Sequence, residues 1–145
     1  MLRGIHPALS PELLATLHRM GHGDELILAD AHFPGENLGA PVLRADGVDI
    51  DTLLDGILPL IMLDTYVEAP LVMMDAVTGD VLDPAVAARY RAVVDRHQPQ
   101  TPTIALLERF SFYERARRAF CVVMTGDAAK YGNLLLKKGV TPPMA

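Results

Sequence analysis

The feature that most constrains the fold of this 145-residue chain is an alternation of short apolar runs with helical segments. Runs of about four to six apolar residues are typical of buried strands, and apolar residues at 3.6-residue spacing are typical of helices. Strands are expected at residues 25–30, 42–45, 71–77, 103–108, 120–125 and 133–136, and helices at 10–20, 49–58, 83–94 and 111–118. This order predicts an α/β fold with a mainly parallel sheet and helices on both faces.

Each expected helix has a recognisable start. Ser10-Pro11, Asp49 and Asp83-Pro84 place an N-cap residue at the head of an apolar helical pattern, in two cases followed by proline at the first helical position. The sequence from Ser111 to Glu114 has the S-x-x-E capping-box pattern. It predicts a fourth helix that begins at Ser111 and pairs Glu114 with Arg118 on a solvated face.

Length and composition favour a single domain over residues 1–145. The formal net charge of −5 argues against nucleic-acid binding, which depends on cationic contacts to phosphate. Cys121 is the only cysteine, so an intrachain disulfide and a CxxC site are excluded. No signal-peptide pattern and no apolar run near 20 residues is visible, so we expect a cytoplasmic protein without a membrane partner.

The densest group of polar residues surrounds the first expected strand. His22 lies between two glycines before this strand, and Asp30 closes it. Imidazole is well suited to moving protons near neutral pH, and ligands of open α/β sheets bind beyond the carboxyl ends of strands. His22 is therefore a candidate acid/base and Asp30 a candidate ligand-binding residue. From spacing alone, a polar turn residue and a loop cap explain them equally well.

Further candidates follow other expected strands. Arg109 comes just after residues 103–108, at a strand carboxyl end, and could share a crevice with Asp30. Tyr131, Gly132 and Asn133 precede the last strand and offer a hydroxyl and an amide to a polyhydroxyl ligand. A surface arginine and a glycine-supported turn are the structural alternatives.

Two other kinds of site are not favoured. His22-x-Asp24 and Asp30-x-His32 have the residue types of a metal site, but they lack helical H-E-x-x-H spacing and no further cluster completes the ligands. The Gly21-His22-Gly23 segment follows a helix and precedes a strand, which is the reverse of a dinucleotide-binding fingerprint. The residues alone therefore indicate a metal site only weakly and do not indicate dinucleotide binding.

Several segments together resemble the D-ribose pyranase / L-fucose mutarotase family, and its fucose branch in particular. They are SPELL at 10–14, MGHGDELILADAHFP at 20–34, LRADG at 43–47, PLVMMDAV at 70–77, RFSFYERA at 109–116 and TGDAAKYGNLLLKKGVTP at 125–142. The resemblance covers nearly the whole chain in order. An arginine at Arg109 and the YGN sequence at 131–133 follow the fucose pattern, where the ribose branch has histidine and YAN.

This resemblance implies an isomerase with no metal and no organic cofactor, which interconverts the anomers of a free monosaccharide, L-fucose or a close relative. It implies that His22 is the catalytic residue and that Asp30, Arg109, Tyr131, Gly132 and Asn133 bind the sugar. It also implies a homo-oligomer, commonly a decameric ring, with sites near subunit contacts. The alternatives are D-ribose pyranase-like activity, a sugar-binding protein without catalysis and, more remotely, a metal-dependent hydrolase.

Overall fold

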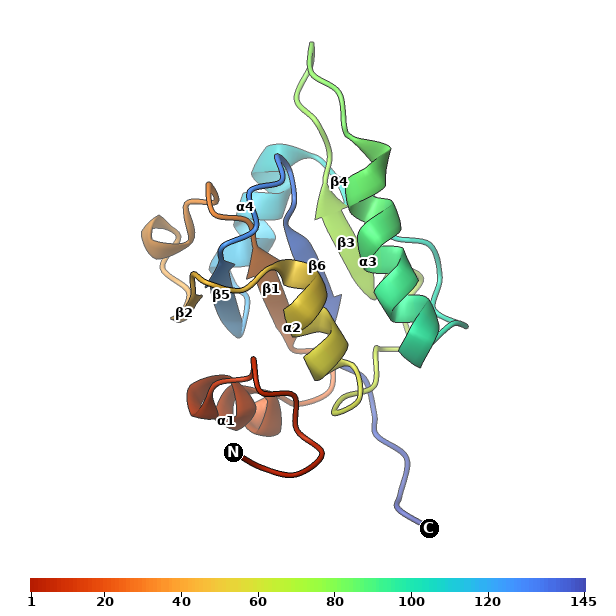
Figure 1. Cartoon of the computed structure of the whole chain (residues 1–145). Helices are drawn as coiled ribbons and strands as arrows, with labels where there is room; N and C mark the ends of the chain where they lie inside the picture. The colour runs from red at the N-terminus through yellow and green to blue at the C-terminus, as the bar shows by residue number, and fades with distance from the viewer.

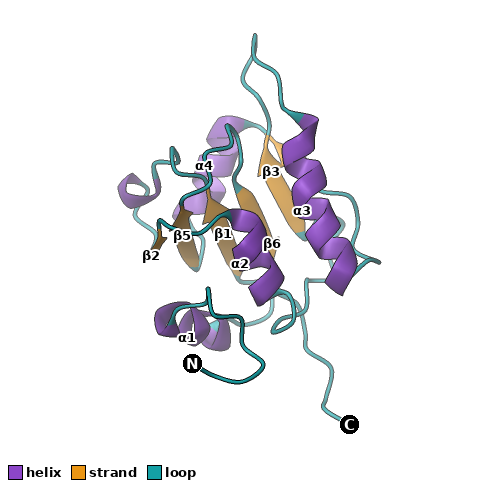
Figure 2. Ribbon diagram, viewed as in Figure 1, coloured by secondary structure: helices purple, strands orange, loops and turns teal.

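A computed structural model describes the whole chain, residues 1–145, as one six-stranded sheet with helices on both faces (Figures 1 and 2). The elements are α1 (Pro11–Arg19), β1 (Glu25–Ala29), the 3₁₀ helix η1 (Gly35–Asn37), β2 (Val42–Ala45), α2 (Ile50–Ile57), β3 (Leu71–Met74), α3 (Pro84–His97), β4 (Ala105–Leu107), α4 (Arg109–Arg117), β5 (Cys121–Thr125) and β6 (Leu134–Lys137). The strand order is β2-β5-β1-β6-β3-β4. The predicted fold class is confirmed.

The sheet is parallel except around its last strand. β1 pairs with β5, β2 with β5 and β3 with β4 in parallel, whereas β6 is antiparallel to both of its neighbours, β1 and β3. All five parallel-oriented strands therefore end at the same edge of the sheet, where β6 begins. We call this the carboxyl edge.

Successive side chains of each strand point to opposite faces of the sheet and pack into two separate cores. Leu26 and Leu28 of β1 face α1, α2 and α3, together with Leu134 and Leu136 of β6. Ile27 and Ala29 face the opposite way, and the core there is closed by α4 and by the segment between β1 and β2. Phe112 of α4 is fully buried in this second core. This two-sided burial explains why the strands are apolar throughout rather than alternating.

Three of the four predicted helix starts are confirmed. The Ser10, Asp49 and Asp83 side chains accept hydrogen bonds from the first-turn N–H groups of α1, α2 and α3. The start predicted for α4 is wrong. Glu108 caps this helix by accepting from Phe110 and Ser111 N–H, so Ser111 lies inside its first turn.

The charge pairing predicted for α4 is also wrong. Glu114 forms an ion pair with Arg117 rather than with Arg118, and Arg115 pairs with Glu25 of β1. The third predicted strand is too long, because β3 ends at Met74 and Asp75 lies in the following loop. An aspartate is ordinary in such a loop position.

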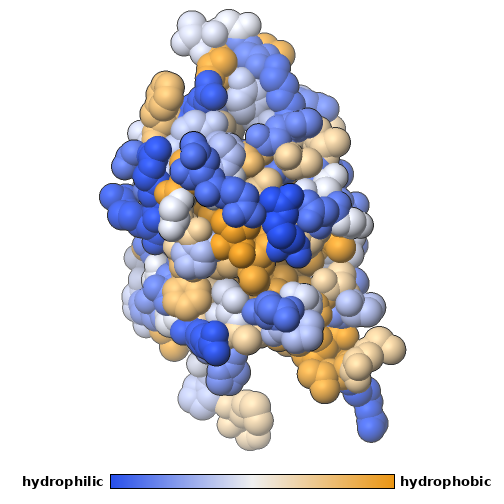
Figure 3. Space-filling model, turned by 90° about the vertical axis from the view of Figure 1, so that its left-hand side faces the viewer, coloured by the Kyte–Doolittle hydropathy of each residue, from blue (hydrophilic) through white to orange (hydrophobic).

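One outer edge of the sheet is β2, whose side chains are only partly buried. Arg44 on this strand is exposed and pairs with Asp46 and Glu36, so charged groups lie at an edge that could otherwise pair with another strand. Seen from this side, the molecule shows a band of hydrophobic residues between hydrophilic ones (Figure 3). None of the helices has the length and apolar character needed to cross a membrane.

Candidate active site

The carboxyl edge brings together the predicted site residues that lie far apart in the sequence. Asp30 directly follows β1, Arg109 begins α4 shortly after β4, and Asn133 directly precedes β6. They border a hollow of about 260 Å³, which we call the carboxyl-edge hollow. Its lining residues are Asp30, His32, Phe33, Pro34, Met74, Arg109, Tyr113, Lys130, Tyr131 and Asn133. Arg109 and Asp30 thus face one crevice, as predicted.

Asp30 organises the floor of this hollow. Its side chain is buried, and its Oδ1 and Oδ2 accept hydrogen bonds from the backbone N–H groups of His32 (2.9 Å) and Gly132 (3.0 Å). The backbone N–H of Asp30 in turn donates to Oδ1 of Asn133 at 2.9 Å. Burial raises the pKa of Asp30, and the two backbone N–H donors offset part of this rise. The carboxylate therefore fixes the backbone that carries Tyr131 and Asn133.

The segment from Tyr131 to Asn133 is held in an unusual conformation. Tyr131 has a φ of +58°, a region that non-glycine residues seldom occupy. The Gly132 carbonyl accepts a 2.7 Å hydrogen bond from the hydroxyl of Tyr90, a fully buried residue of α3. A Cβ at Gly132 would lie 2.8 Å from the Ala129 carbonyl oxygen, so only glycine fits. Both backbone polar groups of Gly132 are thus fixed from within the protein.

The hydroxyl of Tyr131 has partners in the loop that follows β3. It donates to Oδ2 of Asp80 at 2.8 Å and accepts from the backbone N–H of Val77 at 3.4 Å. Lys130 also pairs with Asp80, and these two contacts lower the pKa of Asp80 to about 2. Figure 1 shows this loop projecting beyond β3 at the carboxyl edge. The loop therefore fixes the direction of the Tyr131 hydroxyl.

Arg109 occupies the rim of the hollow and is exposed. Its Nε donates to the Tyr113 hydroxyl at 3.2 Å, and the guanidinium lies over the Tyr113 and Phe110 rings at 5.4 and 5.7 Å from their centroids. Hydrogen bonding to Tyr113 raises the pKa of Arg109. The stacked guanidinium keeps further N–H groups available for ligand oxygens, a geometry that lysine cannot reproduce.

His22 does not share this hollow. It lies before β1, whereas Asp30 lies after it, and five residues of extended chain separate the two by roughly 16 Å. His22 Nε2 is 3.1 Å from Oδ1 of Asp64, and its ring lies 5.2 Å from that of Tyr66. We call His22, Asp64 and Tyr66 the His22 corner. Asp30 of the same chain therefore cannot tune the His22 imidazole; the carboxylate beside it is Asp64.

The same separation bears on the metal alternative. The His22–Asp24 and Asp30–His32 pairs lie at opposite ends of β1, so they cannot share one ion. Asp24 is used locally, where its carboxylate accepts from the Gly21 N–H at 2.7 Å. No group of three or more histidine, cysteine, aspartate or glutamate side chains is placed to hold a metal ion.

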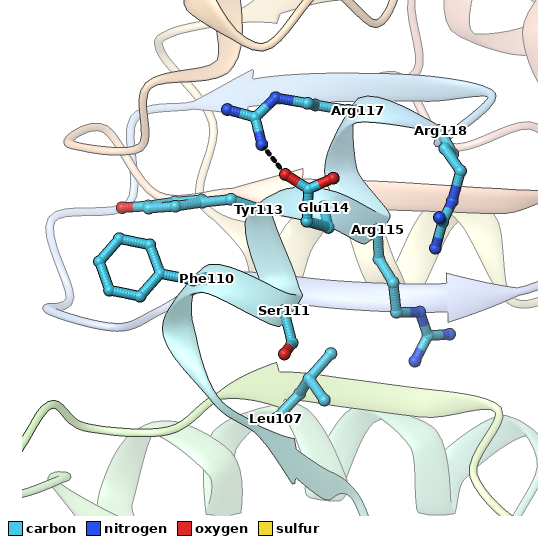
Figure 4. Close-up of a pocket in the computed structure, with 8 residues that line it drawn as sticks. All are labelled: Leu107, Phe110, Ser111, Tyr113, Glu114, Arg115, Arg117 and Arg118. Atoms are coloured by element: carbon cyan, nitrogen blue, oxygen red, sulfur yellow. Dashed lines mark hydrogen bonds and ion pairs between the residues drawn. The ribbon is translucent and has the colours of Figure 1, made fainter.

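A larger hollow of about 640 Å³ lies on the outer face of α4 (Figure 4). Figure 4 shows Tyr113 and Phe110 on one side of this helix and Arg115 and Arg118 on the other. Its one carboxylate, Glu114, is paired with Arg117, and its one partly buried charged group, Arg115, is paired with Glu25 of β1. Nothing in this hollow combines a buried polar group with a free acid or base, so the carboxyl-edge hollow is the better candidate site.

Three residues of these two regions were not identified from the sequence. Asp64 lies in an irregular segment after α2, Asp80 in the loop after β3, and Tyr90 fills an apolar position of α3. No local pattern marks any of them, because their roles arise from contacts made across 42 to 51 residues of chain. Only Tyr90 could have been found from the sequence, because the helical pattern places its hydroxyl in the core, where a buried tyrosine usually has a hydrogen-bond partner.

Comparison with known proteins shows which sequences and folds this chain resembles. The family model described as the RbsD / FucU transport protein family matches residues 3–141. L-fucose mutarotase of Actinobacillus pleuropneumoniae serotype 5b is 58% identical over 142 residues, covering 98% of this chain and 99% of the relative. L-fucose mutarotase of Haemophilus influenzae (strain PittGG) is 59% identical with the same coverage.

Solved structures give the same picture. The fucose mutarotase of Streptococcus pneumoniae, crystallised in complex with L-fucose, superimposes with a TM-score of 0.92 at 43% identity and covers 97% of this chain and 100% of its own. Bacillus subtilis RbsD, complexed with D-ribose, has a TM-score of 0.65 at 18% identity over 92% of this chain and 95% of its own, a likeness of fold alone.

Proposed function

This chain belongs to the RbsD / FucU transport protein family, and we propose that it is an L-fucose mutarotase, an isomerase that interconverts the α and β anomers of the free sugar. The observation that carries the proposal is identity of 58% over nearly the full length of both chains with curated L-fucose mutarotases. The carboxyl-edge hollow is the sugar site in this proposal.

The chemistry fits the groups present. Anomer exchange removes a proton from the anomeric hydroxyl, breaks the bond between C1 and the ring oxygen, and recloses the open aldehyde from its other face. These steps need a positioned acid/base and hydrogen bonds that hold the hydroxyls, without electron transfer or a cofactor. Arg109, Tyr131 and Asn133 supply the hydrogen bonds, and His22 supplies the acid/base.

Because His22 lies at the other end of β1, we infer that a second copy of the chain brings its His22 corner to the carboxyl-edge hollow. Both regions carry exposed aromatic groups of the kind that interfaces bury: Tyr66, 75% exposed, beside His22, and Phe110, 67% exposed, beside Arg109. A ring of identical subunits, decameric as the family resemblance predicts, provides such contacts repeatedly. A cytoplasmic location stays a prediction.

Exchange NMR on purified protein tests the function. We expect saturation transfer between the anomers of L-fucose to increase with protein and to be unaffected by EDTA. Preference for D-ribose would favour the pyranase alternative, and sugar binding by calorimetry without faster exchange would favour the binding-protein alternative. Loss of activity in EDTA and recovery with zinc would favour metal-dependent chemistry.

A mixing experiment tests the shared site. His22→Asn and Arg109→Ala proteins, each of low activity, are dissociated together and reassociated. If each site combines two copies, about a quarter of the mixed sites carry both intact groups, and activity returns to that fraction. If each chain held a complete site, mixing would restore nothing. Light scattering should give a mass many times 15.8 kDa.

A further inference from the structure

The His22 corner contains a buried carboxylate that the proposed reaction has not yet used. The Asp64 side chain is only 2% exposed, whereas that of His22 is 44% exposed. Oδ1 of Asp64 accepts from the backbone N–H of Tyr66 at 2.9 Å and lies 3.1 Å from Nε2 of His22. Burial raises the pKa of Asp64, but these hydrogen bonds outweigh it and hold the pKa below its ordinary value. The carboxylate is thus charged at neutral pH.

The segment that carries Asp64 is fixed at several points. The backbone N–H of Asp64 donates to the Lys137 carbonyl at the end of β6 at 2.9 Å. The preceding N–H, that of Leu63, donates to the side chain of Gln98, a buried residue that also donates to two carbonyls of the loop after α2. A Cβ at Gly139 would lie 2.8 Å from the Asp64 Cα, so the two backbones meet too closely for any other residue.

These contacts hold the Asp64 segment in place, so its carboxylate can orient the His22 ring. A carboxylate accepts hydrogen bonds and cannot donate them, so it selects the imidazole tautomer with its proton on Nε2. Nδ1 then carries the lone pair and has no partner within the chain. Because the imidazole is 44% exposed, a group on a second subunit can approach it.

We propose that Asp64 is a positioning residue for the mutarotase reaction, which holds His22 through Nε2 and leaves Nδ1 as the nitrogen that exchanges protons with the sugar. This inference rests on the proposed function. Nδ1 takes the proton of the anomeric hydroxyl, the bond between C1 and the ring oxygen breaks, and the proton passes from Nδ1 to that oxygen. After rotation about C1–C2 the same steps run in reverse, so no proton or electron is left over.

The tautomer is tested first, on the unmodified protein, by ¹⁵N NMR of its histidine rings at a pH where His22 is neutral, with His22→Asn used to assign the signals. We expect the proton of His22 on Nε2 and a mixture of tautomers in Asp64→Asn. A proton on Nδ1 in the unmodified protein would overturn the proposal. This measurement needs no activity, so it is independent of the proposed function.

The rate effect is tested by a double-mutant cycle on L-fucose exchange. Asp64→Asn should slow exchange by roughly 10- to 100-fold, the scale found for carboxylates that orient metal-bound histidines, and should leave calorimetric sugar affinity within about twofold. In a His22→Asn background the same substitution should have no further effect, whereas additive losses would overturn the positioning role. If Asp64→Asn fails to fold, Asp64→Glu, which keeps the charge and moves it, replaces it in the cycle.

The chain offers a matched control. His97 Nε2 lies 2.7 Å from Oδ1 of Asp55, a second histidine–aspartate pair between α3 and α2, with a more exposed carboxylate and outside both regions of the proposed site. Asp55→Asn should leave exchange unchanged. An unmodified protein that does not accelerate exchange would refute the proposed function, whereas an active one with full activity in Asp64→Asn would refute only the role of Asp64.

Discussion

The two ends of β1 use polar side chains in opposite ways. At the carboxyl-edge hollow, Asp30 and Asn133 are buried, and their side-chain oxygens accept hydrogen bonds from the backbone that shapes the hollow. At the His22 corner, one buried carboxylate is fixed by backbone contacts and presents an imidazole that is 44% exposed. Removing a polar side chain of the hollow should therefore change both stability and sugar binding, whereas removing the exposed imidazole of the corner should mainly change the reaction rate.

The largest expected effect separates rate from stability at the His22 corner. His22→Asn should slow L-fucose exchange by about 10²-fold or more, the scale of a lost general acid/base. The midpoint of urea unfolding should fall only slightly, because the imidazole is 44% exposed and fills no core position, and Asp64 keeps the Tyr66 N–H as a donor. Exchange NMR and urea titration of the same preparation check this. A mutant with the rate of the unmodified protein would remove His22 from the mechanism.

The hollow should respond in the opposite way. Asn133→Ala leaves the buried N–H of Asp30 without its acceptor, which should cost about 1–3 kcal/mol of unfolding free energy. Sugar affinity should fall by roughly 10- to 100-fold as the floor of the hollow relaxes. Calorimetry and chemical denaturation measure both quantities. Weaker binding with unchanged stability would show that Asn133 only contacts sugar and does not support the fold.

Arg109 tests the rim of the hollow, where burial is low. Arg109→Lys keeps the charge but loses the stacking on Tyr113 and the paired N–H donors. We expect sugar affinity to fall by about fivefold, with the unfolding midpoint unchanged. Calorimetric titration with L-fucose is the measurement, and Arg91→Lys on the outer surface of α3 is the control. Equal effects at both positions would argue against a specific role for Arg109.

The smallest effect is expected at Asp80, which orients the Tyr131 hydroxyl from the surface. Asp80→Asn should change exchange by about twofold. The folded-state pKa of Asp80 is lowered to about 2 from an ordinary value of 3.8. Its stabilising contribution is therefore complete above pH 3.8 and lost as the pH falls toward 2. In acid unfolding, Asp80→Asn and the unmodified protein should differ above that window and converge below it.

Much of the fold followed from the sequence because short-range signals determined it. The N-caps at Ser10, Asp49 and Asp83 act within three residues, so their effects are visible locally. The start of α4 was misplaced because Glu108 supplies the same acceptor as Ser111 would, one turn earlier. Strand positions followed from apolar runs, but the antiparallel direction of β6 did not, since direction depends on how the chain returns to the sheet.

The site was only partly predictable for the same reason. Asp30 and Arg109 could be placed together because parallel strands end at one edge of a sheet. The separation of His22 from them also follows from β1, because residues before and after a strand lie at its opposite ends. The glycine-flanked turn and the family resemblance identify residue types and do not show at which end of the sheet each residue lies. Asp64 could not be found, because only the folded chain brings it 3.1 Å from His22.

The position of β6 has a consequence for how this protein folds. β6 follows the other five strands in the sequence, yet it is the only link between the β2-β5-β1 and β4-β3 parts of the sheet. Until residues 134–137 join the sheet, both parts expose an unpaired edge, and the floor of the hollow at Asn133 is missing. Insertion of β6 is therefore the step that joins the two parts and completes the hollow. A chain that lacks β6 would leave two open half-sheets prone to pair with other chains.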